Sequence, residues 1–253
     1  MLHLTTRARA TMRPQHAVRP LNRIALLETA LLGALAALLL LDAERGVLSY
    51  YINPRYTGLV LAGAVALLGL AAARVTALFD AHRPRANHAL GYVLLGLPLF
   101  FGAFFPAQPL GSDRLASHGI GLVGLGGNPR WNSLPASTDT RTWTLLDWSN
   151  ALYGQGARLL GARVQVVGFV FHGAAGAGGA FDVARYVVTC CVADSACIGL
   201  PVVWRGRRAL RNDSWVSVTG RIGQVRVSGT RQPAIIASAV TAIAQPANPY
   251  LSP

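Results

Sequence analysis

The chain has 253 residues, of which 52% are hydrophobic and only 13% are charged. An ordinary soluble domain carries about 25% charged residues, so this composition excludes a protein that is soluble and globular throughout. The formal charge of +13 comes from arginine alone, since the sequence contains no lysine, and the apolar excess is concentrated before residue 106.

A basic arm precedes the first apolar segment. Residues 1–23 contain five arginines and no acidic residue. Positive charges next to a membrane-spanning helix are retained on the cytoplasmic side. Residues 1–23 are therefore predicted to form a cytoplasmic arm.

Residues 24–105 are predicted to contain three transmembrane helices, at about 24–41, 58–79 and 89–105. Spanning a bilayer takes about 20 apolar residues. The first two segments meet this length, whereas the third, which contains Pro98, is marginal. Glu28 in the first segment is expected to lie at the membrane interface beside Arg23. The small residues of the first two helices suit packing within this bundle or docking onto another membrane protein.

The arginine distribution predicts the orientation. Arg74, Arg83 and Arg85 lie in or near the second loop, whereas acidic residues offset the arginines of the first loop. The positive-inside rule then puts the N-terminus and the second loop in the cytoplasm. A cleaved signal peptide is not expected, because the first apolar run is long and charged residues follow it. The chain is therefore predicted to be a multi-pass protein of the plasma membrane, with its C-terminal half outside.

Residues 106–140 are predicted to be a connector, and residues 141–253 a small extracytoplasmic domain rich in β-strands. The connector begins with a stretch rich in Gly and Pro that has no periodicity. Apolar spacing predicts a helix over 143–153 that caps the domain. Five strands are predicted from β-branched and aromatic residues bounded by turn residues, at 163–171, 183–189, 200–204, 215–222 and 235–243.

Five short strands without a long helix between them favour a small all-β barrel of the OB type over a sandwich. Glycines in the first and fourth strands, Gly168 and Gly220, permit the sharp bends of such a barrel. Clustered arginines invite a nucleic-acid interpretation, namely Arg205, Arg207, Arg208 and Arg211. Aromatic stacking residues are sparse among them, and the predicted location is extracytoplasmic. No nucleic-acid partner is therefore predicted.

All three cysteines lie in this domain, at Cys190, Cys191 and Cys197. They fit a metal or thiol site, a disulfide from Cys197 to one of the pair, or inert buried thiols. Neighbouring side chains of a regular strand point to opposite faces. Cys190 and Cys191 can thus reach one ion only if the strand ends or bulges there. If a helical turn follows, Cys191, Asp194 and Cys197 share a face.

The predicted metal ligands are Cys190, Cys191 and Asp194. Two thiolates and a carboxylate suit zinc or another divalent ion, with an open coordination position. His172 is a candidate fourth ligand, although a lone histidine is more often structural. No Cys-x-x-Cys pair is present, so a thioredoxin-like redox motif is excluded.

Several peptides of the chain carry a family resemblance, at residues 51–56, 109–112 with a later Gly119, 167–170, 186–194 and 199–202. The most specific of them contains Cys-Cys-Val-Ala-Asp after a predicted strand. Together they resemble the YcgQ-like two-component permease subunits, a bacterial membrane family. The resemblance covers most of the chain after residue 22. It implies an accessory subunit beside a larger multi-span permease, with a link to metal homeostasis.

In that resemblance Cys190, Cys191 and Asp194 match the cysteine motif of the family, whereas Cys197 lies outside it. The resulting hypothesis is a membrane-anchored accessory subunit that presents an extracytoplasmic metal-binding or thiol site to a multi-span permease. A second hypothesis is a membrane-tethered thiol enzyme with His172 as the base. A third is a structural assembly factor whose cysteines are inert.

Overall fold

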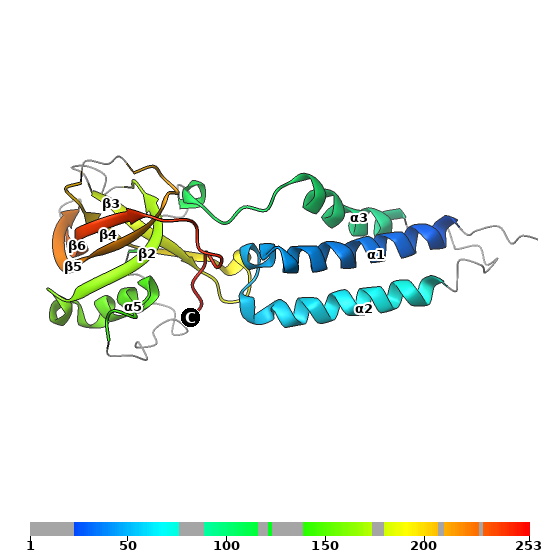
Figure 1. Cartoon of the computed structure of the whole chain (residues 1–253), viewed down its shortest axis with the longest axis horizontal. Coiled ribbons are helices and arrows are strands. Elements are labelled where there is room, and N and C mark those ends of the chain that lie inside the picture. Colours follow the sequence, from blue (N-terminus) through cyan, green and yellow to red (C-terminus); the bar gives the residue numbers. More distant parts are fainter. Residues whose placement is uncertain are drawn as a thin grey trace, which may run out of the picture.

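The computed structural model describes residues 23–75, 89–115, 121–122, 139–173, 180–206, 210–227 and 230–253. The predicted basic arm before residue 23, the end of the second predicted span with its loop, and most of the connector lie outside these residues. The described chain forms an elongated molecule, with apolar helices at one end and a barrel at the other (Figure 1). The C-terminus lies at the junction between the two.

Two helices are long and apolar enough to cross a membrane, α1 (Arg23–Glu44) and α2 (Thr57–Val75). In the most apolar stretches of these helices only 17% and 11% of the residues are buried. Core helices of a soluble domain are mostly buried, so the two helices differ from them. Because α1 lies near the N-terminus, its length and composition also fit a signal sequence. The third apolar helix, α3 (Ala89–Phe104), has 16 residues. It extends about 24 Å, less than the roughly 30 Å hydrocarbon core, so three spans are not confirmed.

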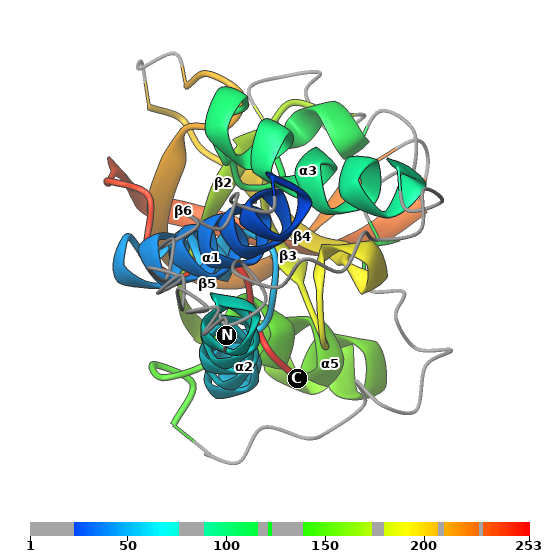
Figure 2. The same ribbon diagram turned by 90° about the vertical axis from the view of Figure 1, so that its right-hand side faces the viewer.

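Helix α1 lies between α2 and α3 (Figures 1 and 2). Glu28 of α1 joins all three helices, because its carboxylate accepts hydrogen bonds from Arg74 of α2 at 2.9 Å and from the Tyr92 hydroxyl of α3 at 2.7 Å. Glu28, which was expected at the membrane interface beside Arg23, forms an ion pair with Arg74. The reason is that the antiparallel return of α2 brings Arg74 alongside the start of α1.

Helices α1 and α3 run in the same direction. Tyr92 lies beside Glu28, and ten residues further along each helix Gly102 approaches Leu38. A Cβ atom at Gly102 would lie 2.8 Å from a methyl carbon of Leu38. The glycine therefore allows α3 to pack closely on α1.

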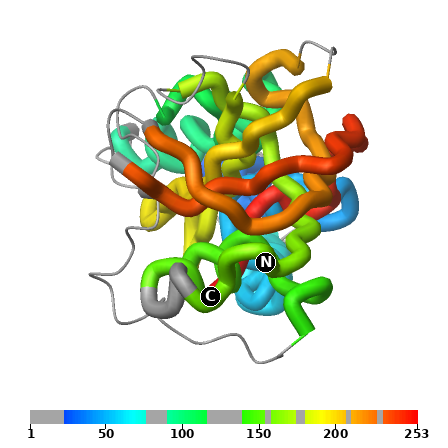
Figure 3. Tube along the Cα trace, turned by 90° about the vertical axis from the view of Figure 1, so that its left-hand side faces the viewer, coloured from blue at the N-terminus to red at the C-terminus, as the bar shows by residue number. Residues whose placement is uncertain are grey.

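The C-terminal part is a closed five-stranded barrel, as predicted (Figure 3). The strands follow the order β4-β3-β2-β5-β6, and a parallel pairing of β6 with β4 closes the circle. A short strand, β1 (Gly121–Leu122), pairs with the part of β4 that precedes its pairing with β6. The bounds are β2 (Arg163–Phe171), β3 (Ala180–Val187), β4 (Ala196–Val203), β5 (Trp215–Val227) and β6 (Thr230–Ala242).

Both predicted bend glycines lie where backbones approach closely. A Cβ atom at Gly168 would lie 2.5 Å from the Ala184 carbonyl oxygen, and one at Gly220 would lie 2.3 Å from that of Ile236. The β5–β6 register also shifts at Thr219/Gly220. These positions exclude any larger side chain unless the strands move apart.

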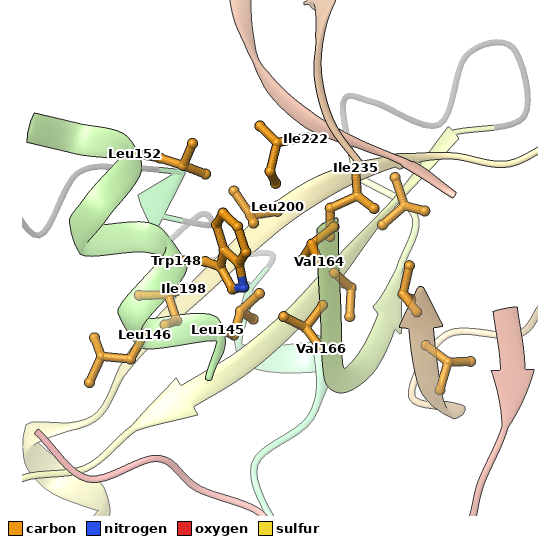
Figure 4. Close-up of a cluster of buried hydrophobic side chains, with 14 of the residues drawn as sticks. Leu145, Leu146, Trp148, Leu152, Val164, Val166, Ile198, Leu200, Ile222 and Ile235 are labelled. Atoms are coloured by element: carbon orange, nitrogen blue, oxygen red, sulfur yellow. The ribbon is translucent and has the colours of Figure 1, made fainter. Parts of the chain in front are cut away.

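Helix α5 (Leu145–Gln155) covers one end of the barrel (Figure 1), as the apolar spacing predicted. Its first turn is capped reciprocally: Asp147 accepts from the Thr144 N–H at 2.8 Å, and the Thr144 hydroxyl oxygen accepts from the Asp147 N–H at 3.3 Å. Trp148 is fully buried against the strands and is surrounded by Leu and Ile side chains such as Ile198 and Leu200 (Figure 4). This core joins α5 to the strands of the barrel.

Candidate functional site

Cys190 and Cys191 lie in a short irregular segment between β3 and β4. Strand β3 ends at Val187, and a single 3₁₀ turn, Val192–Asp194, precedes β4. Because the strand has already ended, the two sulfur atoms need not point to opposite faces, and they lie 3.7 Å apart. Cys190 is exposed and Cys191 is half-buried. The structure thus meets the condition under which both sulfurs can contact one ion.

The Asp194 carboxylate organises this segment. It accepts hydrogen bonds from the backbone N–H of Thr189 at 3.1 Å and of Cys190 at 2.8 Å. The Cys190 thiol and the Cys191 N–H also lie near it and favour its charged form. Partial burial opposes the charged form of Asp194, but these interactions together hold its pKa below the usual range.

The same contacts keep the Cys190 thiol protonated. Its hydrogen bond to Asp194, together with its contact with Cys191, raises the pKa of Cys190 to about 11. A thiolate is the reactive form of cysteine. At neutral pH Cys190 is therefore a poor nucleophile, although it is exposed.

Cys197 does not join the pair. It lies on β4, is 7% exposed, and packs among apolar and aromatic side chains such as Phe169 and Tyr186. Burial raises the pKa of its thiol to about 12. The predicted shared face of Cys191, Asp194 and Cys197 does not form, because β4 begins at Ala196 and no helical turn continues. All three cysteines are free thiols.

His172 lies away from the cysteine pair. It follows the end of β2, where Phe171 pairs with Asp182 near the start of β3, whereas Cys190 follows the end of β3. The Nδ1 atom of His172 lies 2.8 Å from Oδ1 of Asn212. The antiparallel pairing therefore puts His172 at the opposite end of β3, and it cannot be a ligand or base for Cys190.

The cysteine segment pairs directly with the loop between α1 and α2. Ile52 and Cys191 form an antiparallel β-bridge. The Asn53 N–H donates to the Cys190 carbonyl at 3.0 Å, and the Val192 N–H donates to the Tyr51 carbonyl at 2.9 Å. The two cysteines are thus joined through their backbone to the helical end of the molecule.

Asn53 is the centre of this junction and is 4% exposed. Its side-chain amide donates to the Val188 carbonyl at 3.0 Å and to the Ser252 hydroxyl at 2.9 Å. Its Oδ1 atom accepts from the Arg55 N–H at 3.1 Å, which caps the short turn before α2. One side chain therefore ties together the helix loop, the strand end before the cysteines and the C-terminal segment.

Two further contacts fasten the helices to the barrel. Tyr250 donates its hydroxyl to the Tyr50 carbonyl at 3.1 Å and accepts from the Leu110 N–H at 2.9 Å. Ser112, in the segment after α3, donates its N–H and its hydroxyl to the Asp213 carboxylate of the barrel, both at 2.6 Å. A cavity of about 560 Å³ remains between this segment and the aromatic side chains of the barrel.

The donor set around the pair is small. Within the residues that the structure describes, no group of three or more His, Cys, Asp or Glu side chains could hold a metal ion. The sequence pattern indicated the cysteine pair, but it did not predict the contact of the pair with the α1–α2 loop. The signal was present, since residues 51–56 and 186–194 carry the same family resemblance.

Comparison with known protein families matches both parts of the chain. Residues 27–121 match the DUF1980 N-terminal domain, and residues 140–253 match the DUF1980 C-terminal domain. No curated protein and no solved structure shows a significant match.

Proposed function

Because the chain carries both domains of the DUF1980 family, we propose a function that uses the two together. The protein acts as an accessory subunit of a multi-span membrane permease and presents the Cys190–Cys191 pair to that partner. The observation that carries this proposal is the β-bridge between Cys191 and Ile52. A chemical change at the thiols moves the backbone of the cysteine segment, which is hydrogen-bonded directly to the loop between the two membrane helices.

The helix arrangement supports three spans and an outward barrel. Helix α3 runs beside α1 from the level of Glu28 to that of Leu38. The α1–α2 loop and the segment after α3 both contact the barrel, so both emerge at the same end of the helices. With the arginine-rich arm in the cytoplasm, the barrel lies outside the plasma membrane.

The barrel itself supports an OB-like assignment. Its strands pair in the closed order β2-β3-β4-β6-β5-β2, and β4 and β6 are parallel. If β2 to β6 are counted as the first to fifth strands, the order is 1-2-3-5-4-1. This is the strand order of OB folds, which bind ligands with their strands and loops. No nucleic-acid partner is proposed. In this proposal the barrel presents the cysteine pair to the permease and is attached to the α1–α2 loop.

The outer faces of the helices support a membrane partner. Leu59 of α2 and Phe104 of α3 are each 71% exposed. On α1 the residues Ala30, Ala34 and Ala37 are exposed along one side. Small residues at this spacing allow close approach of another helix, so lipid and a multi-span partner together cover these faces.

The site chemistry is metal binding or thiol chemistry. Cys190, Cys191 and Asp194 supply three ligands for zinc or another divalent ion, and each carboxylate oxygen already accepts one backbone hydrogen bond. The thiol-enzyme alternative loses its expected base, because His172 lies at the other end of β3. Two sulfur ligands beside the helix loop are the arrangement that the contacts favour.

The test is transport by the partner in cells that produce a Cys190→Ser, Cys191→Ser double variant. Transport is expected to be lost while the variant still reaches the membrane and co-purifies with the partner. The matched control is Cys197→Ser, which removes a thiol outside the pair and is expected to retain transport. Full transport by the double variant would leave only the assembly-factor function, with inert cysteines.

A further inference from the structure

We propose that Cys190 and Cys191 form a two-sulfur site for a soft monovalent ion, Cu(I) or its analogue Ag(I), and that Asp194 positions the sulfurs without being a ligand. This inference rests on the proposed function of the pair and names the class of ion that it takes. It differs from a zinc site both in the ion and in the role of the carboxylate.

The sulfur geometry suits a single ion. A thiolate–metal bond is about 2.3 Å long, so one ion can contact two sulfurs that lie up to about 4.6 Å apart. The observed separation is 3.7 Å, so the linear arrangement of two-coordinate Cu(I) requires the sulfurs to move apart by about 0.9 Å. Cys190 is exposed, so an ion can enter from solvent without rearrangement of the barrel. On binding, each thiol releases its proton to water as the sulfur–metal bond forms.

The carboxylate is already engaged by the backbone of this turn. Each of its two oxygens accepts one hydrogen bond, from the N–H of Thr189 and from that of Cys190. These bonds curve residues 189 and 190 around the carboxylate and hold Cys190 beside Cys191. Coordination of a metal by Asp194 would compete with the hydrogen bonds that shape the site.

Among the described residues, no His, Cys, Asp or Glu completes a metal-binding group with the pair. Cys197 is buried, with its Sγ directed at the Ile198 carbonyl at 3.8 Å. His172 lies at the far end of β3. Zinc prefers four ligands in a tetrahedral arrangement, whereas thiolates select Cu(I) as a soft ion, for which two sulfurs are a complete ligand set. The described residues therefore favour the soft ion.

The site also has a built-in connection to the membrane helices. The carbonyl of Cys190 accepts from Asn53 and the backbone of Cys191 pairs with Ile52. Movement of either sulfur toward an ion turns the same peptide groups that hold the α1–α2 loop. Occupancy of the site is thereby transmitted to the helices that face the partner.

The experiment uses the full-length protein, purified in detergent under anaerobic, reducing conditions. Cu(I) is titrated in competition with the chelator bathocuproine disulfonate, and Zn²⁺ is titrated in competition with a chromogenic zinc indicator. The variants are Cys190→Ser, Cys191→Ser, Asp194→Asn and the control Cys197→Ser. X-ray absorption at the copper edge reports which atoms are bound.

One Cu(I) per chain is expected, with sulfur-only coordination, and binding is expected to be lost in either Cys190→Ser or Cys191→Ser. The Cys197→Ser control retains it. Asp194→Asn retains sulfur-only coordination with affinity weakened about tenfold, as for the loss of an orienting partner. Absence of Cu(I) binding, or tighter binding of Zn²⁺ with an oxygen ligand that Asp194→Asn removes, would overturn the proposal.

This result is separable from the proposed function. If Cu(I) binds as expected but the double cysteine variant still supports transport by the partner, the ion site stands and the accessory function fails. If transport depends on the cysteines but Cu(I) does not bind, the accessory function stands and the soft-ion assignment fails.

Discussion

The side-chain amide of Asn53 donates a hydrogen bond of 3.0 Å to the backbone carbonyl of Val188, across 135 positions of the chain. This contact joins the loop after α1 to the end of β3, two residues before the cysteine pair. It makes the helices and the barrel one connected structure at the point where the candidate site lies.

Replacement of Asn53 by Ala is expected to destabilise the junction by about 1–3 kcal/mol, because it leaves the Val188 carbonyl buried without its partner. The measurement is thermal unfolding of the full-length protein in detergent. The matched control is Asn212→Ala, which removes an exposed amide bonded to His172 and is expected to cost less. Equal effects of the two substitutions would contradict a central role for Asn53.

The buried carboxyl of Asp182 predicts a pH-dependent stability. It is 2% exposed, one of its oxygens has no hydrogen-bond partner among the described residues, and burial raises its pKa to about 6 despite the opposing charge of His172. Since the folded pKa lies above the unfolded one, the protonated form favours folding. The stabilisation is complete below about pH 4 and is lost as the pH rises through about 6.

Comparison with Asp182→Asn isolates this contribution. The variant is expected to gain stability relative to the original chain as the pH rises from 4 to 7.5, by an amount on the order of 3 kcal/mol. Chemical unfolding of both proteins at a series of pH values measures the difference. A difference that does not change between these pH values would show that Asp182 does not titrate in this range.

The hydrogen bond between Cys190 and Asp194 predicts a slow thiol. In a Cys191→Ser background, alkylation of Cys190 by iodoacetamide at pH 7 is expected to be slow, because its raised pKa leaves little thiolate. Asp194→Asn removes the negative charge that opposes the thiolate and should accelerate labelling. Rates measured from pH 7 to 10 are expected to be higher in Asp194→Asn at every pH, because the thiolate fraction is larger. Cys197 is buried and should remain unlabelled in both, and an unchanged rate in Asp194→Asn would rule out the assigned cause.

The close approach of Gly102 to Leu38 predicts a crosslink between parallel helices. In a background with the three native cysteines replaced by Ser, Leu38→Cys with Gly102→Cys is expected to form a disulfide in membranes. The control pair is Leu38→Cys with Leu94→Cys, in which the second position lies eight residues, or about 12 Å, before Gly102 on α3. Crosslinking of the control pair alone would contradict the parallel arrangement of α1 and α3.

Local patterns were sufficient to predict the five strands and the capping helix, although β3 begins three residues and β4 four residues before the predicted starts. The alternation of β-branched residues predicted β2 with its observed bounds, and the five predicted strands close into one barrel. The β5–β6 hairpin extends beyond its predicted end at Ile222, because Gly223 pairs with Ala234 and continues the ladder to Val227. A glycine that indicates a break in a single strand is tolerated when a partner strand supplies the hydrogen bonds.

The sequence by itself determined where apolar helices and strands form and which segment holds the cysteines, because propensity and periodicity act over a few residues. Only the tertiary structure decided which residues meet. It brought Cys191 to Ile52 and Glu28 to Arg74, and it put His172 and Cys197 out of reach of the pair. These outcomes depend on strand order and helix direction, which are set by burial across the whole fold and not by the neighbours of any residue in the chain.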